Sequence, residues 1–279
     1  MNELRESIDS DGIAYTAGTS QGIAYMRMQE SKRKDRLFND HLAHHFIGER
    51  GERIGQMLDD VTSIISHTVD DYISILVATR TKCINDHLDK WITSMEANGE
   101  KMQVTNLGCG VDTRPFWVES LKKVERYVEV DVESINTFKA NKLKEIEAVP
   151  FCDRQVISMD FQKESVKDLP NHGYDSLLPT CWILEGLVMY LEKNEVHQML
   201  TEMTSLSAKG SYLILNYYNC PYAGHMEASK LDHLSELLKE KGWSNEQIVA
   251  FGDEKFNFGR YPEGLEPSEE HGFAFYELK

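Results

Sequence analysis

The sequence predicts an α/β protein in which a mostly parallel sheet is covered by helices on both faces and preceded by a helical layer. From about residue 102 onward, short apolar runs alternate with segments of helical periodicity, as in a doubly wound sheet. Roughly the first hundred residues show helical spacing without β alternation. Between the two parts, Gly108-Cys109-Gly110 follows an apolar run and predicts a turn of the kind that holds nucleoside cofactors.

The N-terminal layer is predicted to consist of helices. Apolar residues have an irregular but helix-compatible spacing over 22–47 and a cleaner helical period over 54–65. Another helix is predicted over 72–95, and Asn98-Gly99 ends it, since Asn and Gly favour helix C-termini. We expect residues 1–99 to form a helical cap.

The remainder, residues 100–279, is expected to form the core domain, with a substrate-shaping insertion near 218–246. Its predicted strands are 102–107, 126–130, 155–159, 179–184, 211–217, 247–251 and 273–278. Its predicted helices are 116–123, 133–148, 163–169, one that Asn194 caps and Gly210 ends, and one over 222–241. A ligand is expected beyond the carboxyl ends of the strands, beside the first strand.

Composition disfavours several classes of function. Lys and Arg total 30 against 46 Asp and Glu, and a net charge of -16 disfavours binding to nucleic acid or anionic membrane surfaces. Five cysteines without metal-ligand spacing indicate neither a disulfide framework nor a metal site. The acidic N-terminus does not resemble a signal peptide, and no stretch approaches the ~20 apolar residues of a membrane span. We expect a cytoplasmic protein; its oligomeric state is left open.

Gly108 and Gly110 are predicted to bind the cofactor at the end of the first strand. Glycine permits close backbone approach and unusual dihedral angles, although a plain strand-to-helix turn explains the same pattern. The third glycine of the dinucleotide fingerprint is missing, because Val111-Asp112 follows. A pyrophosphate requires an open helix N-terminus there, so a dinucleotide is disfavoured, whereas the sulfonium cofactor S-adenosylmethionine (SAM) does not need one.

Acidic residues end the next two strands. Asp131, 21 residues beyond Gly110, is expected to accept hydrogen bonds from ribose hydroxyls, and a helix N-cap is the alternative role. Asp160 can accept a hydrogen bond from the adenine amino group, and Phe161 can cover the adenine ring. This pair alone favours neither a functional nor a structural role.

Glu185 and Tyr190 follow the fourth apolar run. A buried carboxylate requires a cationic or hydrogen-bonding partner, which we expect to be Arg80 or the cofactor itself. Tyr190 is the candidate for positioning a substrate, and a half-buried core tyrosine is the alternative. No general base is identified, since the histidines are candidates by residue type alone: His44, His45, His172, His225 and His233.

Three segments together resemble the leucine carboxyl methyltransferase family. They are the segments Asn106-Leu107-Gly108-Cys109-Gly110-Val111-Asp112-Thr113-Arg114, Glu129-Val130-Asp131 and Glu185-Gly186-Leu187-Val188-Met189-Tyr190-Leu191. The resemblance runs from about Gly22 to about Asn219, and Asp112-Thr113-Arg114 is similar to the bacterial polyketide-type O-methyltransferase branch. It implies a class I SAM-dependent methyltransferase, with a Rossmann-like seven-stranded sheet containing one antiparallel strand and an N-terminal helical cap.

The resemblance also implies roles for individual residues. Arg80 matches an arginine that grips the SAM carboxylate, and its forked guanidinium suits a bidentate contact. Arg27 is matched, more loosely, to a second basic residue with the same role. By the same resemblance Gly108 contacts SAM through its backbone, Asp131 the ribose, Asp160 with Phe161 the adenine, and Glu185 the amino-acid end.

We therefore expect a SAM-dependent O-methyltransferase that methylates a carboxylate or hydroxyl of a small molecule, a secondary metabolite, and releases S-adenosylhomocysteine. One alternative is a SAM-binding sensor or scaffold without catalysis, and a less favoured one is an NAD-dependent oxidoreductase. Residues 220–279 resemble the family weakly apart from Phe258-Gly259-Arg260, so the acceptor stays open.

Overall fold

A computed structural model describes residues 15–48, 51–53, 69–218, 230–261 and 268–279, and it contains a seven-stranded sheet. The strand order is β3-β2-β1-β4-β5-β7-β6. The strands are β1 (Gln103–Leu107), β2 (Arg126–Asp131), β3 (Arg154–Ser158), β4 (Thr180–Leu184), β5 (Tyr212–Tyr218), β6 (Trp243–Phe251) and β7 (Ser268–Leu278). Six of the seven strands run in one direction, and β7 runs antiparallel between β5 and β6. The predicted mostly parallel sheet and all seven predicted strands are confirmed.

The central strands are covered on both of their faces. Every residue of β1 and of β4 is buried, as expected for apolar runs in a doubly wound sheet. One face packs against α4 (Val69–Ala97) through an apolar cluster that includes Leu88 and Ile183. The other face packs against α6 (Lys193–Ser205) and α7 (Leu231–Glu240) through a second cluster that includes Leu200 and Leu238.

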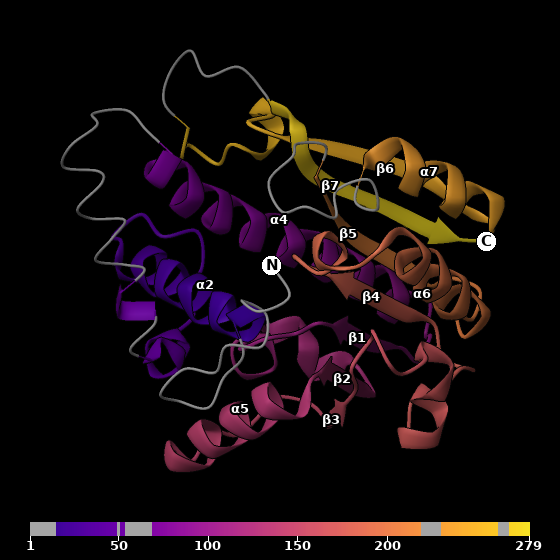
Figure 1. Cartoon of the computed structure of the whole chain (residues 1–279), viewed down its shortest axis with the longest axis horizontal. Helices are drawn as coiled ribbons and strands as arrows, with labels where there is room; N and C mark the ends of the chain where they lie inside the picture. The colour runs from indigo at the N-terminus through magenta and orange to yellow at the C-terminus, as the bar shows by residue number, and fades with distance from the viewer. Residues whose placement is uncertain (1–14, 49–50, 54–68, 219–229, 262–267) are drawn as a thin grey trace.

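Two further helices lie near the predicted ligand-binding edge. The N-terminal helix α2 (Tyr15–Lys32) packs beside α4, away from α6 and α7 (Figure 1). The helix α5 (Glu133–Glu145) follows β2, and its Lys139 Nζ lies 2.9 Å from Glu129 on β2, with both side chains fully buried. This ion pair fixes α5 against the sheet. Among the helices within the described ranges, none is both long and apolar enough to cross a membrane.

Two helix predictions after strands were wrong in type. The segment predicted as a helix over 116–123 forms two 3-10 turns, Arg114–Phe116 and Glu119–Lys123. Its backbone bonds span three residues, such as Phe116 N to Thr113 O at 2.9 Å, while the Asp112 carboxylate accepts the Arg114 N–H at 2.9 Å. The helix predicted over 163–169 is also a 3-10 turn, Val166–His172, which contains Pro170. Local side-chain bonds and proline therefore replaced α-helical bonding.

Other helix boundaries differ in detail. The α6 helix begins one residue before Asn194 and is capped by Glu192, which forms a capping box with Glu195, so the predicted Asn194 cap was wrong. It ends at Ser205, before Gly210. The irregular pattern over 22–47 divides into α2 and a 3-10 turn at Ala43–Phe46. The α4 helix and its end before Gly99, whose φ is 71°, match the prediction.

Several predicted features lie outside the described residues. These are the helical period over 54–65, the first part of the helix predicted over 222–241, most of the start of the proposed insertion near 218–246, and His225. The rest of the insertion corresponds to α7 and the start of β6. The carboxyl ends of β1, β2, β3 and β4 meet at one edge of the sheet, and the candidate site is built there.

Candidate active site

The glycine turn after β1 has the strained geometry that only glycine adopts readily. Gly108 and Gly110 have φ angles of 66° and 51°. A Cβ atom on Gly108 would lie 2.9 Å from Leu187 Cδ1, and one on Gly110 would lie 2.8 Å from Ser20 Cβ of α2. The Gly108 and Cys109 N–H groups donate to Val130 O at 2.8 and 3.2 Å. The turn is thus pressed between α2 and the segment after β4.

Asp131 ties the end of β2 to this turn. Its carboxylate accepts the Gly110 N–H at 2.7 Å and the Val132 N–H at 2.8 Å. Burial raises the pKa of Asp131, and these two hydrogen bonds offset only part of that effect. The N-cap residue of α5 is Val132, so the alternative role of Asp131 as the N-cap was wrong. A carboxylate has lone pairs for about four hydrogen bonds, which leaves capacity for a ligand.

Glu185 is held between two arginines at the end of β4. Arg80 Nε of α4 lies 2.7 Å from Glu185 Oε1, which confirms the predicted partner, and Arg114 Nη1 lies 2.8 Å from Glu185 Oε2. Burial raises the pKa of Glu185, but the charges of Arg114 and Arg80 outweigh it and hold the pKa below its ordinary value. Glu185 is therefore ionised at neutral pH.

Arg114 belongs to the segment that resembles the family, but no site role was predicted for it. Its side chain is fully buried, and besides Glu185 it pairs with Asp112 and donates from Nε to Asn85 Oδ1 at 2.8 Å. Burial lowers the pKa of Arg114, but the two carboxylates raise it above its ordinary value. The sequence did contain a signal for this role, because Arg114 stands two residues beyond Asp112 in the motif that follows the buried strand β1.

Arg27 extends the same group of charges from α2. Its Nη2 donates to Val111 O at 3.0 Å, and its guanidinium lies 3.4 Å from Asp40 and 3.7 Å from Asp112. Arg114 and Arg27 lower the pKa of Asp112 to about 2 against the opposing effect of burial. We call six charged groups the charge cluster: the buried side chains of Arg27, Arg80, Arg114, Asp40 and Asp112, and the nearly buried side chain of Glu185. With three charges of each sign, it is neutral overall.

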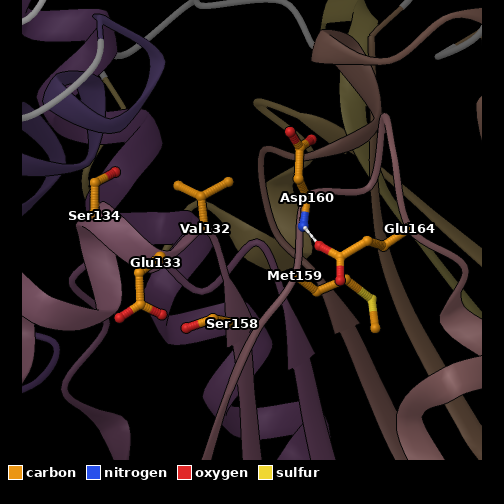
Figure 2. A pocket seen from close by; sticks show the side chains of 7 residues that line it. All are labelled: Val132, Glu133, Ser134, Ser158, Met159, Asp160 and Glu164. Atoms are coloured by element: carbon orange, nitrogen blue, oxygen red, sulfur yellow. Dashed lines mark hydrogen bonds between the residues drawn. The ribbon is translucent and has the colours of Figure 1, made fainter.

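A pocket of about 330 Å³ opens between the ends of β2 and β3 (Figure 2). It is lined by Val132, Glu133, Ser134, Ser158, Met159, Asp160 and Glu164. The Glu164 carboxylate accepts the Asp160 N–H at 2.8 Å, the bond drawn in Figure 2, and Asp160 pairs with Lys163 at 2.7 Å. Val132 and Met159 supply apolar surface at this mouth, which suits a flat heterocycle.

The pocket agrees with only part of the residue-level prediction. Asp160 lines it, whereas Phe161 does not, and the Phe161 ring packs partly buried against the apolar cluster beneath α6. Val132 and Met159 were missed, although Val132 directly follows the acidic residue that ends β2 and Met159 directly precedes Asp160. Tyr190 is partly buried in a 3-10 turn, Val188–Tyr190, five residues beyond Glu185.

His87, whose pKa is strongly lowered, was not among the histidines considered as a general base. His87 of α4 is buried, its Nδ1 lies 2.8 Å from the Tyr212 hydroxyl, and its ring stacks 3.5 Å from Phe275. Burial lowers its pKa to about 4. Tyr212 begins β5, so His87 lies at the opposite edge of the sheet from the glycine turn. Within the described residues, no group of three or more His, Cys, Asp and Glu side chains is arranged to hold a metal ion.

Comparisons with known proteins agree with this architecture. Residues 20–204 match the family model described as leucine carboxyl methyltransferase. A Streptomyces coelicolor protein is 33% identical over 76% of this chain and 71% of its own length, and a Parafrankia protein is 31% identical over 77% and 67%. The names of both assign them to the SAM-dependent methyltransferases.

Solved structures share the fold at low sequence identity. A methyltransferase from Thermobifida fusca, so named in the description of its crystal structure, superposes with a TM-score of 0.58 at 14% identity, covering 93% of this chain and 94% of its own. A DUF574 family protein from Streptomyces avermitilis superposes with a TM-score of 0.54 at 11% identity, covering 92% and 97%. At such identities the likeness extends to the fold alone.

Proposed function

The chain belongs to the leucine carboxyl methyltransferase family, and from this premise we propose that its candidate site transfers the SAM methyl group to an oxygen atom of a small molecule. SAM-dependent methyl transfer is the activity of the family. The proposal adds that the acceptor atom is a carboxylate or hydroxyl oxygen, that the acceptor is a secondary metabolite, and that the residues below bind the cofactor.

The observation that carries the proposal is the direct pairing of Arg80 with Glu185 beside the glycine turn. The amino-acid end of SAM carries a carboxylate and an ammonium group, which are the opposite charges to these two side chains. Among the described residues Arg80 forms an ion pair with Glu185 alone, so its remaining N–H groups can donate to a ligand carboxylate. Arg114 contacts the other oxygen of Glu185, Oε2, and keeps the Glu185 carboxylate ionised, so that it can pair with the ammonium group of SAM.

The neighbouring features fit the nucleoside part. Asp131 offers acceptor capacity for ribose hydroxyls while it holds the Gly110 N–H. We assign the adenine to the pocket between Val132 and Met159, with Asp160 at its rim as an acceptor for the amino group. Phe161 would reach the ring only by leaving its present packing, so we give it no direct contact.

The turn suits SAM better than a dinucleotide. The first strand is followed by 3-10 turns, and the nearest N–H groups are taken by Val130 and Asp131. The segment that directly follows β1 therefore offers no α-helix N-terminus with free N–H groups, as pyrophosphate binding requires. This arrangement disfavours the alternative of an NAD-dependent oxidoreductase.

Bound SAM supplies a methyl group already activated by the sulfonium sulfur. The acceptor oxygen would attack the methyl carbon in line while the carbon–sulfur bond breaks and its electron pair returns to sulfur. The protein would contribute by holding the two reactants in line and excluding water. We propose that the N-terminal cap takes part, because Ser20 and Arg27 of α2 lie against the glycine turn, and that Tyr190 orients the acceptor.

The acceptor class decides whether a base is needed. A carboxylate attacks without losing a proton, whereas a hydroxyl must be deprotonated. The experiment is a transfer assay with methyl-labelled SAM and matched pairs of acceptors that differ only by a carboxylate or a hydroxyl. Labelled ester or ether supports the proposal. Tight SAM binding without transfer to any acceptor would favour the non-catalytic sensor or scaffold instead.

A further inference from the structure

Arg260 joins two parts of the chain that are 230 residues apart. Its Nη2 lies 2.7 Å and its Nε 3.3 Å from the two carboxylate oxygens of Glu30 on α2. Its Nη1 also lies 3.1 Å from the carboxylate of Asp35. The side chains of Arg260 and Glu30 are only 6% and 4% exposed. A forked contact with both carboxylate oxygens, shielded from water, is a strong and directional ion pair.

The segment before Arg260 is itself anchored to the sheet. Phe256 and Phe258 pack against the apolar cluster beneath α4, and Lys82 of α4 lies 5.3 Å from the centre of the Phe258 ring. Phe258 and Gly259 both have positive φ angles, 51° and 73°, which turn the chain immediately before Arg260. A left-handed conformation is costly for phenylalanine, so the surrounding contacts must hold it in place. Arg260 therefore extends from a fixed position.

This anchored segment begins at the edge of the sheet that carries the glycine turn. β7 is antiparallel to both β5 and β6, so β6 runs in the same direction as β5 and β1. The end of β6 at Phe251 consequently lies at the same edge as Gly108. Arg260 follows nine residues after the end of β6, which is the last strand in the sheet order. Its side chain connects this end of the sheet to α2 through Glu30.

Glu30 is connected to the cofactor edge through its own helix. It lies three residues beyond Arg27, and residues at this spacing share one face of a helix. Arg27 donates to Val111 O of the turn, and Ser20 of the same helix lies against Gly110. The Glu30 carboxylate also accepts the Leu37 N–H at 2.6 Å, which fixes the chain as it leaves α2. Holding Glu30 therefore holds Arg27 against the turn.

We propose that Arg260 is a positioning residue for cofactor binding, which acts through Glu30 to keep Arg27 and the N-terminal half of α2 against the glycine turn. The inference rests on the proposed function, because it assumes that SAM binds at that turn. It gives a role to the Phe258-Gly259-Arg260 motif, which lies outside the candidate site.

The chain provides a matched control in Arg33. Its guanidinium also pairs with Asp35, at 3.0 Å, and approaches Glu30 at 3.7 Å, but it is 50% exposed and lies next to α2 in the sequence. Arg33→Ala removes a positive charge from the same two carboxylates without cutting the connection to the C-terminal segment. Arg260→Ala removes the connection itself.

The experiment compares the wild type, Arg260→Ala and Arg33→Ala by calorimetric titration with SAM and by hydrogen exchange of the cofactor-free proteins. We expect Arg260→Ala to weaken SAM binding by about tenfold and to speed exchange at amides of α2. Arg33→Ala should stay within about twofold of the wild type, as exposed ion pairs contribute little. Arg260→Lys keeps the charge without the forked contact, so its SAM affinity should lie between those of the two alanine variants. It replaces Arg260→Ala in the comparison if the alanine variant does not fold.

Two results would overturn the inference in distinguishable ways. Wild-type SAM affinity in a folded Arg260→Ala or Arg260→Lys protein, with only a lower melting temperature, would leave Arg260 a purely structural role. Equal losses in the Arg260 and Arg33 variants would show an effect of charge rather than of the connection. If the wild type itself binds no SAM, the proposed function fails, and this inference fails with it before any variant is compared.

Discussion

Arg80 Nε lies 2.7 Å from Glu185 Oε1, so the long helix before the sheet and the end of its fourth strand meet in one buried ion pair. The two side chains are 7% and 9% exposed, and Arg114 holds the second oxygen of Glu185. Each member of the pair is the counter-charge for one end of an amino-acid zwitterion. The candidate site thus contains complementary charges side by side, as the proposed contacts with the amino-acid end of SAM require.

Replacing Arg80 by Lys should weaken SAM binding. Lysine keeps the positive charge but cannot hold Glu185 and a ligand carboxylate with one planar fork. We expect a loss of about 1.5–3 kcal/mol by calorimetry, the range for a charge-assisted hydrogen bond. Lys90→Ala is the control, since Lys90 lies on the same helix and its side chain is exposed. If Arg80→Lys binds SAM with wild-type affinity, the contact with the SAM carboxylate must be assigned to another residue, with Arg27 as the next candidate.

Asp131→Ala should also weaken SAM binding by about 1–3 kcal/mol, because ribose hydroxyls and the Gly110 N–H lose their acceptor. Asp153→Ala, which removes an exposed carboxylate just before β3, should leave the affinity unchanged. Calorimetric titration of both variants tests this prediction. An unchanged SAM affinity in Asp131→Ala would remove Asp131 from the binding site.

Arg114→Leu should destabilise the fold as well as the site. Its removal leaves Asp112 and Glu185 buried with fewer counter-charges, and breaking such a pair typically costs about 3–5 kcal/mol. Arg126→Ala, which loses a partly exposed pair with Asp153, should cost less than about 1 kcal/mol. Urea unfolding measures both changes. A loss for Arg114→Leu no larger than that of the control would show that the charge cluster contributes no stability.

His87 should make stability depend on pH in a defined window. Its pKa in the folded state is lowered to about 4, against about 6.5 in an unfolded chain, so the unfolded state binds more protons between these values. Stability should therefore fall as the pH is lowered from about 6.5 to about 4. The His87 contribution is on the order of 2 kcal/mol, allowing for partial screening. His87→Gln should lose this slope when unfolding free energies are measured across the window; parallel curves would contradict the assignment.

The central strand β4 was predictable because it is a short apolar run covered on both faces. All five residues of Thr180–Leu184 are buried, and the shortness of the apolar run favours a strand over a helix. The residues at the strand ends were equally accessible, since Asp131 and Glu185 are carboxylates at the ends of apolar runs. The pairing of Glu185 with Arg80 was predicted because a buried carboxylate requires a partner, whereas the hydrogen bond from the Gly110 N–H to Asp131 was not predicted.

The failures have a common physical cause, which is that tertiary contacts overrode local signals. The turn after Gly110 was expected to open an α-helix, but Asp112 binds the Arg114 backbone N–H and side chain instead. Burial of Arg114 between two carboxylates cannot be read from spacing, since its second partner, Glu185, follows β4 and lies far away in the sequence. His87 was missed for the same reason, because its partners Tyr212 and Phe275 are far away in the sequence.

The most direct test of the SAM site compares the wild-type affinities of S-adenosylhomocysteine and 5′-methylthioadenosine by calorimetry. The two compounds share the nucleoside and the sulfur atom, but only the first has the amino-acid end that Arg80 and Glu185 are assigned to hold. Two charge-assisted contacts of about 1.5 kcal/mol each predict roughly 100-fold tighter binding of S-adenosylhomocysteine. Arg80→Ala should narrow this difference. Equal affinities in the wild type would contradict the assignment of these two residues to the cofactor.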